Sequence, residues 1–113
     1  MTAARQRLGA QGEQVVARWY RRRGYRVVAR NWRCAEGEID LVLSQAKTLV
    51  FCEVKTRTSL AYGHPAEAVT RAKQRRIRRL ALRFLETHQH RGRLRFDVAA
   101  VLPDSVEVIE DCF

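Results

Sequence analysis

The sequence has no apolar run long enough to span a membrane, and its first twenty residues contain charged side chains without an unbroken apolar core. We therefore expect neither a transmembrane helix nor a secretory signal peptide. The three cysteines are an odd number and form no Cys-x-x-Cys pair, which argues against a zinc site. This use of cysteine favours the reducing cytoplasm over secretion.

Several patterns of catalytic and cofactor-binding residues are also missing. The sequence shows no Ser-His-Asp set, no P-loop, no Gly-rich dinucleotide loop and no Cys/His metal cluster. Acidic residues are scarce, with 12 Asp+Glu against 22 Lys+Arg, which gives a formal net charge of +10. This excess predicts an anionic partner, and nucleic acid, an anionic membrane and the ribosome all remain open on charge alone.

The chain of 113 residues is expected to form one domain, residues 1–113, and a homodimer would widen its binding surface. Apolar periodicity predicts the following elements: a helix over 4–23, a strand over 25–32, a hairpin over 37–55 with its turn at 44–47, a helix over 65–88, and strands over 94–102 and 106–110. This order predicts an α/β fold with a mixed sheet flanked by helices. We expect Leu8 and Val15 in the apolar stripe of the first helix and Ala72 on the core-facing side of the second. The second helix should make the fourth strand parallel to one of the first three.

The predicted hairpin is rich in Val, Leu, Ile and Phe but carries Asp40, Glu53 and Lys55. Such side chains are rarely buried unless they are paired or bound. Glu53 and Lys55 are two residues apart in one strand and share a face, and Asp40 can lie across from them. Two carboxylates beside an ammonium are typical of a divalent-metal site for phosphate chemistry. The alternative is a cross-strand ion pair that fixes the register of the hairpin.

Asp40 followed by Glu53-Val54-Lys55 resembles the PD-(D/E)xK nuclease superfamily, although Ile39 rather than Pro precedes the aspartate. A larger ordered set of segments resembles the YraN family of small bacterial proteins: Gly12-Glu13, Gly24-Tyr25, Arg30-Asn31-Trp32-Arg33, Gly37-Glu38-Ile39-Asp40-Leu41, Phe51-Cys52-Glu53-Val54-Lys55-Thr56-Arg57 and Arg95-Phe96-Asp97-Val98. The resemblance to the nuclease superfamily implies a restriction-endonuclease-like αβββαβ core.

The same resemblance implies roles for particular residues. Asp40, Glu53 and the Val54 carbonyl would hold Mg²⁺ or Mn²⁺, and Lys55 would orient water or stabilise the charge of the transition state. Glu13 matches the first-helix acid of resolvase-like nucleases, with a solvated helix residue as the alternative. Glu38 competes for a ligand position, but it begins a strand, where contact with solvent is expected.

Basic residues supply candidates for nucleic-acid contact. Lys73, or its neighbour Gln74, is a candidate contact to the scissile phosphate, with a snorkelling lysine as the alternative. An arginine row on the second helix has only Glu86 as an acidic partner in sequence and predicts phosphate contacts: Arg71, Arg75, Arg78, Arg79 and Arg83. Further candidates are Arg57 in the loop after the hairpin and a second patch formed by Arg21, Arg22, Arg23, Arg26, Arg30 and Arg33.

These observations predict a metal-dependent endonuclease that hydrolyses phosphodiesters in nucleic acid, with DNA favoured over RNA and branched DNA as a candidate substrate. A non-catalytic nucleic-acid-binding protein that keeps a nuclease fold is the alternative from a different class. A third hypothesis is a factor associated with RNA or the ribosome. We expect Arg95 and Asp97, on one face of the fourth strand, to pair with each other as a structural feature.

Overall fold

The computed structural model describes the backbone of residues 3–59, 61 and 63–113, and within these ranges the side chains from residue 11 onward. Its elements follow in the order α1 (Ala3–Arg22), β1 (Arg26–Cys34), β2 (Gly37–Gln45), β3 (Thr48–Thr56), the 3-10 helix η1 (Pro65–Ala68), α2 (Arg71–Thr87), β4 (Arg93–Leu102) and β5 (Ser105–Ile109). No helix in the described part of the chain is both long and apolar enough to cross a membrane.

The five strands form one mixed sheet in the order β1-β2-β3-β4-β5. Strands β3 and β4 pair in parallel, with Thr48 opposite Arg93, and the other neighbouring strands pair antiparallel. The parallel pairing follows from the crossover through α2, as the sequence predicted. The α/β fold is thus confirmed, and its αβββαβ order is compatible with a restriction-endonuclease-like core.

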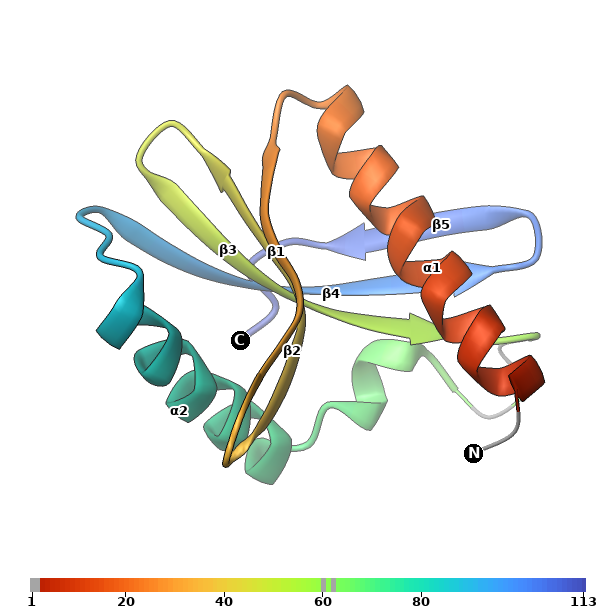
Figure 1. Cartoon of the computed structure of the whole chain (residues 1–113). Coiled ribbons are helices and arrows are strands. Elements are labelled where there is room, and N and C mark those ends of the chain that lie inside the picture. The colour runs from red at the N-terminus through yellow and green to blue at the C-terminus, as the bar shows by residue number, and fades with distance from the viewer. Residues whose placement is uncertain (1–2, 60, 62) are drawn as a thin grey trace.

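The two helices cover opposite faces of the sheet, as Figure 1 shows. On one face Val16, Ala17 and Tyr20 of α1 pack on Leu41 and Cys52. On the other face the apolar side of α2 packs on the sheet through Ile77, Leu80, Ala81 and Phe84, which meet Ile39, Val42, Phe51 and Phe96. The sheet is therefore buried on both sides, which explains the nearly continuous apolar character of β2 and β3.

The predicted helix over 65–88 is wrong in one respect, because the structure divides it. Pro65 begins a single 3-10 turn, and Val69 then leaves helical geometry with φ −90° and ψ 80°. Thr70 caps the α-helix proper, its hydroxyl oxygen accepting the backbone amide of Lys73 at 3.3 Å. Ala72, predicted on the core-facing side, is exposed. Leu8, predicted in the apolar stripe of the first helix, lies outside the described side chains.

A buried polar centre ties α1 to β4 and to the C-terminal segment. The Asp97 carboxylate is fully buried and accepts hydrogen bonds from Arg95 Nε at 2.9 Å, from Arg95 at its second nitrogen at 2.8 Å, and from the Tyr20 hydroxyl at 2.6 Å. The backbone amide of Asp111 donates a further bond at 3.0 Å. The pairing of Arg95 with Asp97 was predicted, whereas the Tyr20 and Asp111 contacts depend on tertiary packing.

Candidate active site

Asp40 lies where β2 and β3 separate. The ladder between the two strands runs from Gln45 opposite Thr48 to Leu41 opposite Cys52 and ends there. Ile39 packs in the core under α2 and Leu41 in the core under α1, so the usual alternation of faces is interrupted at Asp40. Its carboxylate reaches sideways instead, and Oδ2 accepts the backbone amide of Val54 at 2.8 Å.

Three carboxylates converge at this point. One oxygen from each of Glu13, Glu38 and Asp40 lies within 4.8 Å of the other two, and all three residues are half-buried. Glu13 comes from α1 and the other two from β2, so this acidic cluster joins two elements. Glu38 is part of the cluster, although it was predicted to be a weaker ligand candidate than Asp40 and Glu53.

The glycine before Glu13 allows α1 to approach the sheet closely. A Cβ atom on Gly12 would overlap the Thr56 hydroxyl oxygen at the end of β3. A larger residue would therefore push α1 away from β3 or force Thr56 into another rotamer. Gly12 thus permits the close packing of α1 on β3 that brings Glu13 near Asp40.

Burial and mutual repulsion act together on these acids. Burial is the main cause that raises the pKa of Asp40 to about 7, and the negative charge of Glu53 adds to it. The Val54 amide opposes this shift, while Glu13 and Glu38 reinforce it. Burial also raises the pKa of Glu13, against a hydrogen bond from the Asn31 side chain. Such clustered, mutually raised acids are a mark of functional sites.

Glu53 and Lys55 form an ion pair beside the acidic cluster. Lys55 Nζ lies 3.3 Å from Glu53 Oε1, and the two side chains are 19% and 18% exposed. The contact is consistent with their predicted placement on one face of β3. Glu53 is close enough to raise the pKa of Asp40 but does not belong to the group of three carboxylates. The site therefore contains four acids and one lysine, which is one acid, Glu38, more than the predicted set of Glu13, Asp40, Glu53 and Lys55.

Asn31 lies in the Arg30-Asn31-Trp32-Arg33 motif, and no role was predicted for it. It adopts a positive φ of 49°, which asparagine tolerates better than most residues. Its side-chain amide lies close enough to Glu13 to lower the pKa of that carboxyl. The one available signal was an asparagine inside a strand of otherwise apolar and basic residues.

The stability of the metal-free protein should decrease as the pH rises from about 4 to about 7. The folded-state pKa of Asp40 is about 7 against an ordinary value of 3.8, so the folded protein binds this proton more tightly. Its contribution is complete below about pH 4 and is lost as the pH rises through about 7, an effect of up to about 4 kcal/mol. Urea unfolding in EDTA from pH 4 to 8 measures it, and Asp40→Asn should flatten the profile. A wild-type minus variant difference that is constant with pH would contradict this assignment.

The arginine row of α2 is less free than the sequence indicated. Glu36, in the turn between β1 and β2, lies 3.8 Å from Arg79 and 2.6 Å from Arg83, and Arg83 also pairs with Glu86. The prediction that Glu86 is the row's sole acidic partner is therefore wrong. Arg78 lies over the ring of Phe96, 5.0 Å from its centroid. Among the described residues, Arg71 and Arg75 are exposed and have no acidic partner. The same holds for Arg76, which was not among the predicted phosphate contacts.

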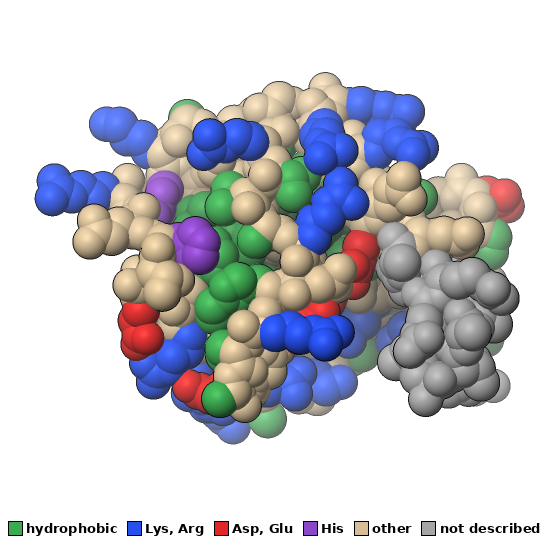
Figure 2. All heavy atoms as spheres, in the orientation of Figure 1, with side chains coloured by type: hydrophobic (Ala, Val, Ile, Leu, Met, Phe, Trp, Pro, Cys, Tyr) green, Lys and Arg blue, Asp and Glu red, His purple; other side chains and the backbone are tan. Residues whose placement is uncertain are grey.

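The remaining basic candidates are separated from one another. Lys73 is half-buried in the first turn of α2, and the Gln74 amide donates to the Val69 carbonyl at 3.1 Å. Arg57 is exposed just after β3, and its backbone amide donates to the Val101 carbonyl at 2.8 Å. Figure 2 shows Lys and Arg side chains spread over the visible face with few carboxylates among them, as the net charge of +10 implies.

Comparison with known proteins identifies the family. A family model described as "Uncharacterised protein family UPF0102" matches residues 12–101, a span that contains all four acids of the site and Lys55. The chain belongs to the UPF0102 family. This is the family that the sequence motifs resemble under the name YraN.

Relatives within UPF0102 align over most of their length. A UPF0102 protein of Beutenbergia cavernae is 57% identical over 100 residues, which cover 88% of this chain and 85% of the relative. One of Clavibacter michiganensis subsp. michiganensis is 53% identical over 110 residues, covering 92% and 93%. One of Rhodococcus opacus is 47% identical over 112 residues, covering 94% and 95%. The names of these UPF0102 proteins state no activity.

Proposed function

We propose that this UPF0102 protein is a metal-dependent nuclease of the PD-(D/E)xK superfamily that hydrolyses phosphodiesters in nucleic acid, with DNA as the favoured substrate. The observation that carries the proposal is the half-buried acidic cluster of Glu13, Glu38 and Asp40 beside the Glu53–Lys55 pair. Clustered carboxylates raise one another's pKa and gain most from a divalent cation.

The donor set fits Mg²⁺ or Mn²⁺, which prefer hard oxygen ligands and commonly bind one or two carboxylates plus water and phosphate. Asp40, Glu53 and the Val54 carbonyl remain the proposed ligands, and Glu13 and Glu38 join them because they lie in the cluster. Four carboxylates face three cations: Lys55 beside Glu53, Arg33 at 3.4 Å from Glu38, and Arg30, whose charge lowers the pKa of Glu13. The negative charge that is left over is one that a divalent cation would balance. When bound, the ion would supply Lewis-acid stabilisation of the charge that develops on the phosphate.

The remaining chemistry belongs to the chain's own side chains. Lys55 holds its ammonium next to Glu53, where it can orient the attacking water or stabilise charge on the phosphate oxygens. The Val54 amide holds the Asp40 carboxylate in one orientation, which fixes the ligand before the substrate arrives.

Nucleic acid would bind through the exposed arginines of α2 that have no acidic partner in the described part of the chain: Arg71, Arg75 and Arg76. We expect Arg75→Gln to weaken duplex binding and to lower the salt dependence by about one counterion, because one phosphate contact is lost. Arg83→Gln should have a smaller effect, since Glu36 and Glu86 already engage Arg83. Fluorescence anisotropy of labelled duplex between 50 and 200 mM salt measures both, with exposed Arg91→Gln as the control. Equal losses from Arg75→Gln and Arg83→Gln would contradict this assignment.

The proposed activity is tested with purified protein, Mn²⁺ and labelled branched, single-stranded and duplex DNA. Cleavage should require Mn²⁺ or Mg²⁺ and should disappear in Asp40→Ala and Lys55→Ala. Cleavage that persists in both variants would come from a contaminating nuclease. The absence of cleavage on every substrate, in protein that binds the ion, would overturn the catalytic proposal.

A non-catalytic nucleic-acid-binding protein is the second candidate, favoured by the exposed basic residues of α2, which do not depend on the acidic cluster. The two functions differ in their need for metal. Calorimetry that finds no uptake of Mg²⁺ or Mn²⁺, together with DNA binding unaffected by EDTA, would support the binding protein. Uptake that Asp40→Asn removes would support the nuclease.

A further inference from the structure

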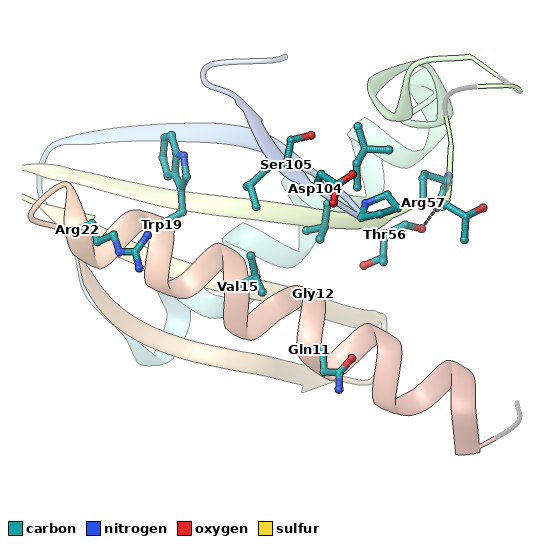
Figure 3. Close-up of a pocket in the computed structure, with 14 residues that line it drawn as sticks. Gln11, Gly12, Val15, Trp19, Arg22, Thr56, Arg57, Asp104 and Ser105 are labelled. Atoms are coloured by element: carbon teal, nitrogen blue, oxygen red, sulfur yellow. Dashed lines mark hydrogen bonds between the residues drawn. The ribbon is translucent and has the colours of Figure 1, made fainter.

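A groove of about 670 Å³ lies between α1 and the β4–β5 turn, on the sheet face opposite α2. Figure 3 shows Gln11, Val15, Trp19 and Arg22 of α1 along one side, with Thr56, Arg57, Asp104 and Ser105 across from them. The volume is within the range of about 300–1,000 Å³ that small-molecule sites occupy. Neither the acidic cluster nor the Glu53–Lys55 pair lines it.

The walls of the groove are largely apolar and partly open to solvent. They include Val15 and Trp19 of α1 and several residues at the β4–β5 turn: Val101, Leu102, Pro103 and Val106. Val15 is 36% exposed, so its apolar side chain is open to the groove. The sequence had predicted Val15 in the apolar stripe that covers the core, and the structure leaves it on the groove.

The charges of the groove favour an anionic ligand with apolar parts. Arg22 and Arg57 line it against a single acid, Asp104. One end of the groove is lined by Gly12 and Thr56, the chain neighbours of Glu13 and Lys55. Glu53 and Lys55 alternate with Leu49 and Phe51 toward the α2 face, so a strand bound in the groove would pass around the end of β3 to reach them.

We propose that this groove binds an unpaired segment of the nucleic-acid substrate, with bases against Val15 and Trp19 and phosphates near Arg22 and Arg57. A duplex presents mainly phosphates and stacked bases, so it cannot use the apolar walls, whereas a single strand offers both unstacked bases and charge. This inference rests on the proposed nuclease function and narrows its substrate to nucleic acid that carries unpaired nucleotides beside the cleaved bond.

A second copy of the chain fits the groove less well. In a two-fold interface the same patch meets itself, so Arg22 and Arg57 of both copies would be buried together with only Asp104 of each copy as a counter-charge. Removing such cations from water without matched acids is unfavourable.

Tryptophan fluorescence tests the proposal directly, because the chain has 2 tryptophans. Trp32 packs edge-to-face on Phe84 with ring centroids 5.4 Å apart, in the core under α2, so Trp32→Phe leaves Trp19 as the sole reporter. In EDTA, an eight-nucleotide oligothymidylate should quench Trp19 emission. An abasic oligomer with the same number of phosphates should not quench it and should bind about tenfold more weakly.

The substitution Val15→Glu places a negative charge on the apolar wall of the groove and so should weaken binding there. Because Val15 is already partly exposed, the variant is expected to fold, and far-ultraviolet circular dichroism checks this. It should raise the Kd for the oligothymidylate about tenfold and that for a duplex less than twofold. The control Arg91→Gln should change both by less than twofold. Sedimentation of wild type and Val15→Glu should show the same oligomeric state.

Three results would overturn the inference: equal quenching by the abasic oligomer, equal loss of single-strand and duplex binding in Val15→Glu, or a change of oligomeric state without a change in single-strand affinity. Because these measurements are made in EDTA, they do not depend on cleavage. A protein that binds unpaired nucleotides in the groove but cuts nothing would disprove the nuclease proposal alone. A protein that cuts DNA without Trp19 quenching would disprove the groove proposal alone.

Discussion

Asp40→Asn is expected to lower the rate of metal-dependent cleavage by more than about 100-fold while leaving the protein folded. Removal of an outer partner of a metal ligand already costs about 10–100-fold, so loss of a central ligand should cost more. The asparagine side-chain oxygen can still accept the Val54 amide that Asp40 accepts at 2.8 Å. Single-turnover cleavage of labelled DNA in Mn²⁺ measures the rate.

The stability of the Asp40→Asn variant shows whether Asp40 is a metal ligand or an acid that the fold itself requires. Because burial and neighbouring acids raise the pKa of Asp40 to about 7, removing its charge should leave the metal-free protein at pH 8 equally or more stable. Glu86→Gln, which alters an exposed acid at the far end of α2, is the control and should retain full activity. An Asp40→Asn protein that cuts at the wild-type rate, or that unfolds, would contradict the role assigned to Asp40.

Asp97→Ala should lower the free energy of unfolding by about 3–5 kcal/mol. Asp97 is fully buried and Arg95 is 8% exposed, so the change leaves the Arg95 guanidinium buried without its counter-ion. The Tyr20 hydroxyl and the Asp111 amide lose their acceptor as well. Urea unfolding measures the effect, and a loss of this size is a large part of the stability of a small domain, about 5–15 kcal/mol.

Two further variants show whether the charge or the shape of Asp97 matters. Asp97→Asn keeps the shape but removes the charge that pairs with Arg95, so it should remain strongly destabilising even where Asp97→Ala fails to fold. Tyr20→Phe removes one donor and leaves the ion pair intact, for a loss of about 1–2 kcal/mol. An Asp97→Asn protein as stable as the wild type would show that the buried charge contributes nothing.

The fold could be predicted from the sequence because its signals are local. Runs of apolar residues of strand length, bounded by turn residues, give each strand, and the crossover rule gives the parallel pairing of β3 with β4. The break at Val69 and Thr70 was missed because Pro65 is itself a strong helix start. Thr70 carried the competing signal, since threonine is a good N-cap.

In the site, only contacts between residues of one strand could be predicted, because these follow from the alternation of side chains. Glu53 and Lys55 share a strand, so their contact follows from the two-residue period. The meeting of Glu13 with Glu38 depends on how closely α1 packs, which Gly12 permits but does not specify. Glu36 reaches α2 from a turn 47 residues away in sequence from Arg83, and no local pattern gives such a contact.

Anomalous scattering from crystals soaked in Mn²⁺ is the most direct test of whether the acidic cluster binds a divalent cation. We expect one or more anomalous peaks within ligand distance, about 2.0–2.2 Å, of carboxylate oxygens of Asp40 and of at least one of its acidic neighbours. We also expect the peak to be absent from Asp40→Asn crystals soaked in the same way. No peak at the acidic cluster in well-ordered wild-type crystals, or a peak that survives in Asp40→Asn, would contradict the proposed metal site.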